Sequence, residues 1–410
     1  MLNAFTNTRT WMVASLLAAA SIFGQDIAAN TSAQKAPQPR PNCDQKPVCP
    51  PKPCCPERPE LKLNCAYNAP ARIEVDSCSC WDFYFGASFI YWEAMQDNME
   101  FAATASTGVA NDFFATGAGN TTSAEIVGHD FSYKPGFKVL AGMNFDRDHW
   151  DGYLEYTWFK STTTTSVSAG PDSATARLGV LPVRGNGFML NDADANPNTS
   201  TSAFNSASQE WKLKFQSLDA ALARTYYVGT QLTFRTIMGA RFAWFTQTLS
   251  DTFTSDGTLN QSAGVRTYHE RQNFSSWGAG LMAGLNTKWM LGEGFSMIGN
   301  GSFDLLYTRV QTTNTKFSNT VAGAAPSVYA FPDDRPDFVM PHASLEFGFA
   351  WGSYFDCYNW HVDFAATYGF QVFWDANLFR NFEGSQAAFS GRGTGNLYMH
   401  GLNLSARLDF

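Results

Sequence analysis

The sequence lacks an apolar run long enough to cross a bilayer as a helix. Its one long apolar run, Trp11 to Gly24, has 14 residues, and a membrane-spanning helix needs about 20. The mean hydropathy of −0.23 excludes a bundle of such helices. Charged residues make up only 16% of the 410 residues, against about 25% in soluble domains. The net charge of −8 and the lack of a basic patch exclude a nucleic-acid partner.

Catalytic and cofactor-binding motifs are also missing. The six histidines are scattered, and there is no HExxH, no GxSxG elbow, no P-loop and no dinucleotide fingerprint. We therefore expect no enzyme, no catalytic residues, no cofactor and no metal. A hydrolase assembled from Ser, His and Asp on separate strands is the alternative. Two aspartate groups read as turn residues, with a cation site as the alternative: Asp146, Asp148 and Asp151, and Asp333, Asp334 and Asp337.

The first 29 residues read as a cleaved export signal. Arg9 precedes the apolar run, and small residues follow at Ala28 and Ala29. Residues 30–80 then form a segment rich in cysteine and proline, with little apolar content to bury, so we expect it to be largely irregular. Residues 81–410 form the main body.

The main body alternates apolar and small or polar residues with a period of two. In 277–289, most odd-numbered residues are apolar, among them Trp277, Leu281, Leu285 and Trp289, and most even-numbered ones are glycine or polar. The same alternation runs through 137–145, 362–374 and seven further segments. A period of two is the signature of β-strands, so the chain is predicted to be all-β.

The connections alternate strictly between short and long. Short joints fall at 146–150, 224–230, 291–294 and 355–359. Long polar segments cover the other joints: 96–132, 161–208, 248–272, 310–337 and 376–396. This alternation is typical of an antiparallel transmembrane β-barrel of the bacterial outer membrane, with short periplasmic turns and long extracellular loops. We count ten strands, or twelve if 176–185 contributes a hairpin.

Three segments resemble a known family: WDFYFGASFIYWEAMQDNMEFA (81–102), the hairpin at 211–244, and the closing MHGLNLSARLDF (399–410). They are similar to the Legionella-type pore-forming outer-membrane proteins, a family that includes major-outer-membrane-protein-like porins of chlamydia-related bacteria. The resemblance covers about residues 80 to 410. It implies a passive pore rather than a particular substrate.

Barrel strands place large apolar residues toward lipid and tolerate charge toward the lumen. Charges that this rule assigns to the lumen are Lys138, Lys212, Lys214, Arg235, Arg241, Lys288, Asp304, Glu346 and Asp363. They would set ion preference or, alternatively, form salt bridges that stiffen the barrel. Tryptophans near strand ends suit the aromatic girdles at the membrane interfaces: Trp92, Trp158, Trp289, Trp351 and Trp374. Leu404, Leu408 and Phe410 of the last strand resemble the signal read by the outer-membrane barrel assembly machinery.

Seven cysteines lie before residue 81 and one far beyond: Cys43, Cys49, Cys54, Cys55, Cys65, Cys78, Cys80 and Cys357. Disulfides persist outside the cytoplasm, and Cys357 lies in a short joint, on the side predicted for the segment 30–80. We expect disulfides within the chain, between copies of it, or to cysteine-rich envelope proteins. An internally knotted periplasmic plug and a zinc site are the alternatives.

The predicted function is a porin-like outer-membrane protein through which small solutes or ions diffuse. Its partners would be outer-membrane lipid, the assembly machinery and disulfide-linked neighbours, and its cysteine segment and C-terminus would be periplasmic. The alternative is a non-conducting envelope structural protein, or a surface adhesin that acts through its loops.

Overall fold

The computed structural model describes residues 69–73, 75, 81–107, 123–145, 149–168, 180–183, 204–256, 265–323, 325–331, 336–356, 359–382, 390–392 and 395–410. The chain divides into Met1–Pro50 and Pro51–Phe410, and the described residues all belong to the second unit. The predicted signal, all eight cysteines and the aspartates at 146, 148, 333 and 334 lie outside the described residues. Among the residues described, no helix is long and apolar enough to cross a membrane.

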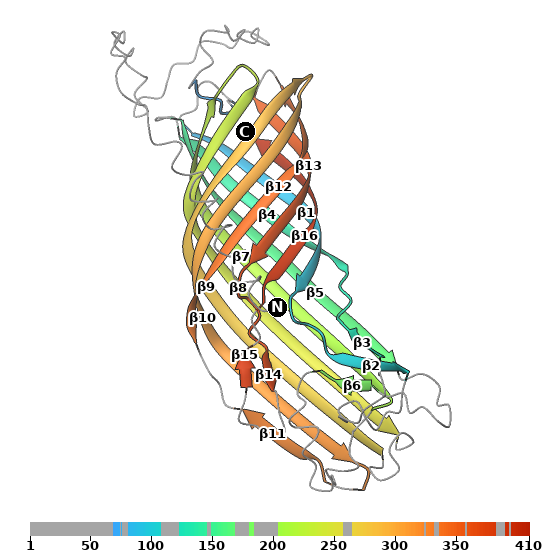
Figure 1. Ribbon diagram of the computed structural model, residues 1–410. Helices are drawn as coiled ribbons and strands as arrows, with labels where there is room; N and C mark the ends of the chain where they lie inside the picture. Colours follow the sequence, from blue (N-terminus) through green and yellow to red (C-terminus); the bar gives the residue numbers. More distant parts are fainter. Residues whose placement is uncertain are drawn as a thin grey trace, which may run out of the picture. The chain divides into compact units, whose positions relative to one another are not determined.

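Ten long strands form a closed antiparallel ring, as expected for this alternating sequence (Figure 1). They are β1 (Trp81–Gln96), β4 (Tyr133–Phe145), β5 (Trp150–Ser168), β7 (Ser206–Tyr227), β8 (Leu232–Asp256), β9 (Val265–Gly292), β10 (Phe295–Val321), β12 (Asp337–Phe355), β13 (Trp360–Phe373) and β16 (Leu397–Asp409). Each pairs with the next along the chain, and β16 pairs with β1 to close the ring. The prediction of an all-β, ten-stranded barrel is confirmed.

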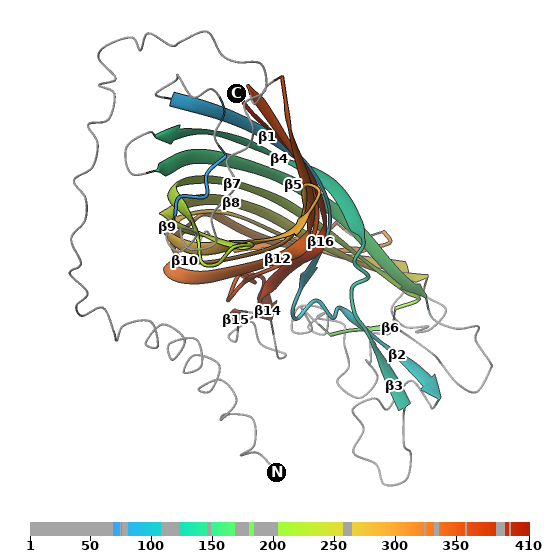
Figure 2. The same ribbon diagram turned by 90° about the horizontal axis from the view of Figure 1, so that it is seen from above.

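Six short strands complete the described structure: β2 (Ala102–Thr107), β3 (Ser123–Val127), β6 (Val180–Pro182), β11 (Ser327–Phe331), β14 (Arg380–Phe382) and β15 (Ser390–Arg392). β11 adds one further strand to β10, while β3, β2 and β6 form a separate small sheet. Figure 2 shows β2, β3 and β6 lying beyond the ring. The segment 176–185 therefore supplies β6 to this sheet, and among the described strands it adds nothing to the ring.

The two ends of the barrel differ in their connections. At one end, which we call the turn end, the ring strands join through short connections such as Glu293–Gly294 between β9 and β10. β1 begins and β16 finishes at this end, where Phe83 and Phe410 exchange backbone hydrogen bonds. The five longer connections lie at the other end, which we call the loop end. The predicted segregation of connections by length is therefore present.

The strands β7 to β10 are longer than the sequence suggested. The segments 248–272 and 310–337 were expected to be loops, but β8 continues to Asp256, β9 begins at Val265 and β10 continues to Val321. In these extensions the apolar side chains, such as Phe253, point inward, and the outward side chains are mostly polar. A polar outer face resembles a loop in sequence, which explains the error.

The outer face nearer the turn end is apolar. Leu281 of β9 is 81% exposed, and Phe85, Phe347 and Phe364 are exposed on other strands. Such a band of bulky apolar side chains costs free energy in water but is favourable against lipid tails. Because all strands close into a ring, their backbone groups are paired within the wall, as a bilayer requires.

Candidate functional site

The lumen of the barrel is the one place where charged side chains from many described strands converge, and it has three layers. A polar cavity opens at the turn end. An ionic layer follows. Beyond it, a mainly apolar layer fills the loop half, together with buried polar side chains such as Gln247, Glu270 and Gln272.

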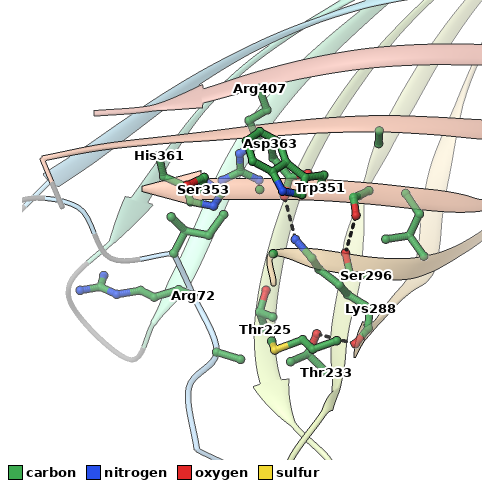
Figure 3. Close-up of a pocket in the computed structure, with 18 of the residues that line it drawn as sticks. Arg72, Thr225, Thr233, Lys288, Ser296, Trp351, Ser353, His361, Asp363 and Arg407 are labelled. Atoms are coloured by element: carbon green, nitrogen blue, oxygen red, sulfur yellow. Dashed lines mark hydrogen bonds and ion pairs between the residues drawn. The ribbon is translucent and has the colours of Figure 1, made fainter. Parts of the chain in front are cut away.

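The cavity at the turn end has a volume of about 1170 Å³. Figure 3 shows Lys288 of β9 reaching Asp363 of β13 inside it, with Nζ and Oδ2 2.7 Å apart. Arg72 also lines the cavity; it belongs to the short segment 69–73, whose Ala71 N–H donates to Thr225 O at 3.2 Å. The segment thus continues along β7 beyond the end of β5, and the mouth carries both charge and a piece of the chain before β1.

A second group of charges lies in the wall of this cavity. Arg235 of β8 forms a two-point ion pair with Asp151 of β5, and Tyr84 donates to the same carboxylate at 2.9 Å. Arg407 of β16 stacks over the Tyr84 ring and pairs with Asp409. Each of these charges is therefore compensated by a neighbour, as burial requires.

The ionic layer is crossed by a bridge from one wall to the other. Lys138 Nζ of β4 lies 3.3 Å from Glu346 Oε1 of β12 and 3.8 Å from Glu155 Oε1 of β5. β4 and β12 are four strands apart by the shorter way around the ring, so the bridge spans the lumen. Asn403 also donates to Glu346 Oε1 at 3.0 Å, and accepts a hydrogen bond from Trp92 Nε1 at 2.6 Å.

Arg241 of β8 holds the other half of the ionic layer together. Its Nε and Nη2 each donate to Asp219 at 2.7 Å, and its Nη1 donates to Asp304 Oδ2 at 2.7 Å. His342 lies 2.7 Å from the same Asp304 oxygen and stacks on Phe373. This is the strong, bidentate geometry of arginine and carboxylate. The free space left between the two halves is only about 40 Å³, room for about one or two water molecules.

The ionic layer carries more acid than base. Among its described residues, two basic side chains, Lys138 and Arg241, face four carboxylates, which leaves a formal excess of two negative charges. The carboxylates are Glu155, Asp219, Asp304 and Glu346.

The apolar layer closes the lumen. The Phe373 ring of β13 lies 5.4 Å from Phe215 of β7 and 5.0 Å from Phe245 of β8, measured between ring centroids. β13 is five strands from β7 in either direction around the ring, so these rings meet across the full lumen. Trp92 and Phe159 pack into the same cluster. No continuous path is therefore open through the described interior.

The structure places seven of the nine predicted lumen charges in the lumen: Lys138, Arg235, Arg241, Lys288, Asp304, Glu346 and Asp363. It contradicts the other two. Lys212 and Lys214 are exposed on the outer face of β7, where Lys212 pairs with Glu210 at 2.7 Å. Their neighbours Trp211 and Phe215, which look lipid-facing in the sequence, are buried inside the lumen.

The prediction for Trp92 is wrong for the same reason. It was expected in an interfacial girdle but is 4% exposed inside the lumen. Trp289 lies exposed on the outer face, and Trp158 and Trp351 share that face. In the loop half of the barrel, large apolar residues point inward, which the sequence rule for lipid-facing strands does not anticipate.

Several lumen residues escaped the sequence reasoning. Leu154 and Tyr156, the neighbours of Glu155 in the strand, lie on the outer face. The alternation along the strand alone therefore places Glu155 in the lumen. Asn403 and Arg407 follow from Leu404 and Leu408 in the same way. Other missed members are Asp82, Asp151, Asp219, Asp251, Glu270, His342, His361 and Asp409. Leu404 and Phe410 of the last strand are exposed on the outer face, and Leu408 shares it.

Metal-binding geometry is not found in the described part of the chain. No group of three or more His, Cys, Asp or Glu side chains there is arranged to hold a metal ion. Asp151, once a candidate for a turn cation site, is instead paired with Arg235.

Several solved structures are similar to this chain at low sequence identity. The outer membrane protease OmpT of Escherichia coli matches at 10% identity with a TM-score of 0.28, covering 80% of this chain and 96% of its own. A major outer membrane protein of Thermus thermophilus matches at 12% identity and a TM-score of 0.24, covering 81% and 100%. The CymD monoaromatic hydrocarbon channel matches at 11% identity with a TM-score of 0.30, and the match covers 80% of this chain and 88% of the CymD chain. At these values nothing about function follows from them.

A comparison of the sequence with curated proteins finds no match. A family model described as "Legionella pneumophila major outer membrane protein precursor" matches residues 76–410. This match covers the whole ring of strands and confirms the resemblance found in the three sequence segments. It also agrees with the apolar outer band, and the outer membrane is therefore the location of the barrel. The chain belongs to the family of the Legionella major outer membrane protein.

Proposed function

We propose that this protein is an outer-membrane channel for small ions and solutes, with a path that runs through the barrel lumen. The observation that carries the proposal is the ionic layer, a charged cross-section continuous with the cavity at the turn end. Buried ion pairs stabilise a fold less than apolar packing of similar volume does. A barrel built only for stability would have no need of six charged side chains at this level.

Cations are the preferred ions in this proposal. The excess of two negative charges among Lys138, Arg241 and the four carboxylates favours a positive ion at the same level. Rings of acidic side chains set cation preference in pores. Lys138 and Arg241 would act as tethered counter-ions that an arriving cation replaces.

The described state is closed, and conduction requires side chains to move. The bridge from Lys138 to Glu346 and the contacts of Phe373 both cross the lumen. Rotamers of exposed side chains change within picoseconds to nanoseconds, and loops move within nanoseconds to microseconds. The channel would therefore open by rearrangement inside a wall that stays intact.

Planar-bilayer conductance of the purified, folded protein tests this function. Discrete conductance steps are expected. Silence from barrels that are shown to be folded, for example by their heat-dependent mobility on gels, would instead support the alternative: a non-conducting envelope structural protein or a surface adhesin. The filled lumen is the observation that favours this alternative.

We further propose that the turn end faces the periplasm and the loop end the exterior. Bacterial outer-membrane barrels carry their short connections on the periplasmic side. The C-terminus and the segment before β1 would then be periplasmic. Phe410, exposed at the turn end, would be accessible to the barrel assembly machinery on that side.

The cysteine segment would act as a cross-linkable periplasmic tether. Arg72, which lies six residues before Cys78, and Asp356, which adjoins Cys357, line the same cavity. This convergence supports a disulfide between the two regions, and the remaining cysteines would be left for copies of the chain or other envelope proteins.

Non-reducing gels test the tether. A shift to dimers or higher species without reductant is expected, and Cys357→Ser should change the pattern of disulfide-linked peptides found by mass spectrometry. A protein that runs as a monomer with and without reductant, and that is unaffected by serine at every cysteine of 43–80, would refute the tether.

A further inference from the structure

The connection between β13 and β16 enters the barrel at the loop end. Its described part begins at Trp374, directly after Phe373 of β13, and runs to Phe382. Ala376, Asn377 and Phe379 are 5%, 2% and 1% exposed. A connection that lay on the surface would not bury three residues so close together. We call Trp374–Arg380 the plug.

One anchor of the plug is Gln272 of β9. The Arg380 N–H donates to Gln272 Oε1 at 2.8 Å, and Gln272 Nε2 donates to Arg380 O at 2.8 Å. The glutamine amide thus pairs with both backbone groups of one residue, as a neighbouring strand would. Gln272 is 3% exposed, so water does not compete with these bonds. The Phe379 ring packs on Phe274 of the same strand at 5.2 Å.

A second anchor lies on the end of β1. Asn377 Nδ2 donates to Asp97 O at 2.8 Å, while Asn377 Oδ1 accepts from Phe379 N at 3.0 Å. The carboxylate of Asp97 accepts from Asn396 N at 3.0 Å, which ties the far end of the connection to the same place. β1 and β9 are five strands apart in either direction around the ring. The two anchors therefore sit on opposite walls, and the plug spans the lumen.

The plug differs from the rest of the closed interior in how it is held. Phe215, Phe245 and Phe373 belong to ring strands, with backbones fixed by sheet pairing. The plug has no such pairing up to Phe379. It is held by two backbone hydrogen bonds, from Trp374 N to Pro341 O at 3.1 Å and from Asn377 N to Gly395 O at 3.0 Å, together with a few side-chain hydrogen bonds and apolar contacts. Segments with few anchors have the smallest local opening free energy. The plug is thus the part of the closure that can leave without opening the wall.

We propose that the plug is the gate of the channel: it closes the lumen at the loop end and opens it by moving away. The hydrogen bonds of Gln272 and Asn377 hold the plug in the closed position, and we call these two residues the latches. This inference rests on the proposed channel function. Release of the plug would withdraw Phe379 from Phe274, remove the cover from Phe373, and allow the aromatic rings below to rotate.

The test compares the wild-type protein with Gln272→Leu and Asn377→Ala in planar bilayers. Gln272→Leu keeps the approximate size of the side chain and removes both bonds to Arg380, as well as the bond from Gln272 Nε2 to Glu270 Oε1 within β9. The loss of two hydrogen bonds is expected to shift the balance from closed to open about tenfold, seen as a longer open time or a higher frequency of opening. Gln216→Leu is the matched control, because Gln216 lies on the outer face of β7.

A second readout does not depend on conduction. Trypsin cleaves after arginine, and the backbone of Arg380 is held by Gln272 in the closed plug. Both latch variants should be cut after Arg380 faster than the wild-type barrel, by a factor of about ten on the same arithmetic, while Gln216→Leu is cut at the wild-type rate.

The outcomes separate the gate from the channel. If the wild-type protein conducts, and both latch variants open and are cleaved after Arg380 at the wild-type rate, the gate is refuted and the channel function stands. If cleavage shows that the plug is released but no variant conducts, the channel function is refuted and the gate with it. A silent or rarely open wild type together with active latch variants supports both.

Discussion

At the scale of the residue, the main finding is that the lumen charges work in pairs across strands. Lys138 reaches Glu346, and Arg241 holds Asp219 and Asp304 at once. The two interpretations drawn from the sequence, ion preference and a salt-bridged lumen, are therefore not exclusive. In the proposed channel, the paired Lys138 would close the path when no ion is present and would release Glu346 when a cation arrives.

Arg241→Met tests how strongly the ionic layer holds the wall together. The change leaves two buried carboxylates without their arginine, and loss of one partner of a buried pair costs about 3–5 kcal/mol. The free energy of unfolding, measured by denaturant titration in detergent micelles or lipid, should fall by that amount.

Arg309→Met is its control. Arg309 makes an exposed ion pair with Asp337 at 3.8 Å, and exposed pairs contribute about 0–1 kcal/mol. Equal losses for the two variants would contradict a structural role that is specific to the ionic layer.

At the scale of the element, parity along each strand explains both the successes and the failures of the sequence reasoning. Where Leu281 and Leu285 face lipid, the small and polar partners face the lumen as expected. In the extensions of β7 to β10 the rule inverts, because water surrounds the wall and the apolar side chains pack inside. Lys212 and Lys214 were assigned to the lumen because the sequence does not show where the lipid band stops.

Leu281→Arg locates this band. Leu281 is 81% exposed on the outer face of β9, and an arginine facing the middle of the bilayer costs a barrel about 2–4 kcal/mol. The variant should unfold from lipid vesicles at a correspondingly lower denaturant concentration.

The matched change Thr164→Arg lies on the outer face of the β5 extension, opposite Glu210. It should leave the free energy of unfolding nearly unchanged. A large loss at Thr164, or none at Leu281, would show that the lipid band lies elsewhere on the wall.

At the scale of the whole molecule, the sequence predicts the wall well and the interior poorly. Alternation, the spacing of connections and the closing strand to Phe410 are local patterns, and they were enough to predict the ring of ten strands. The family came from the resemblance of the three segments 81–102, 211–244 and 399–410. The plug and the aromatic contacts of Phe373 could not be foreseen, because they join residues that only ring closure brings together. Gln272 and Arg380, 108 positions apart, carry no mark of their pairing in the sequence.

The closed interior sets the central question for the whole molecule: whether a filled ten-stranded barrel conducts at all. Barrels of about eight strands are filled by their own side chains, and those of about 16 to 18 leave a channel. This barrel lies between the two. Its unequal lumen charge and its weakly held plug favour a conduit that opens transiently.

The reversal potential in a KCl gradient tests this account most directly. Wild-type channels should show a potential of the sign expected for K⁺ over Cl⁻, and Glu346→Gln should move it toward zero because one lumen carboxylate loses its charge. A potential of the opposite sign, or one that Glu346→Gln leaves unchanged, would contradict an ion path through the ionic layer.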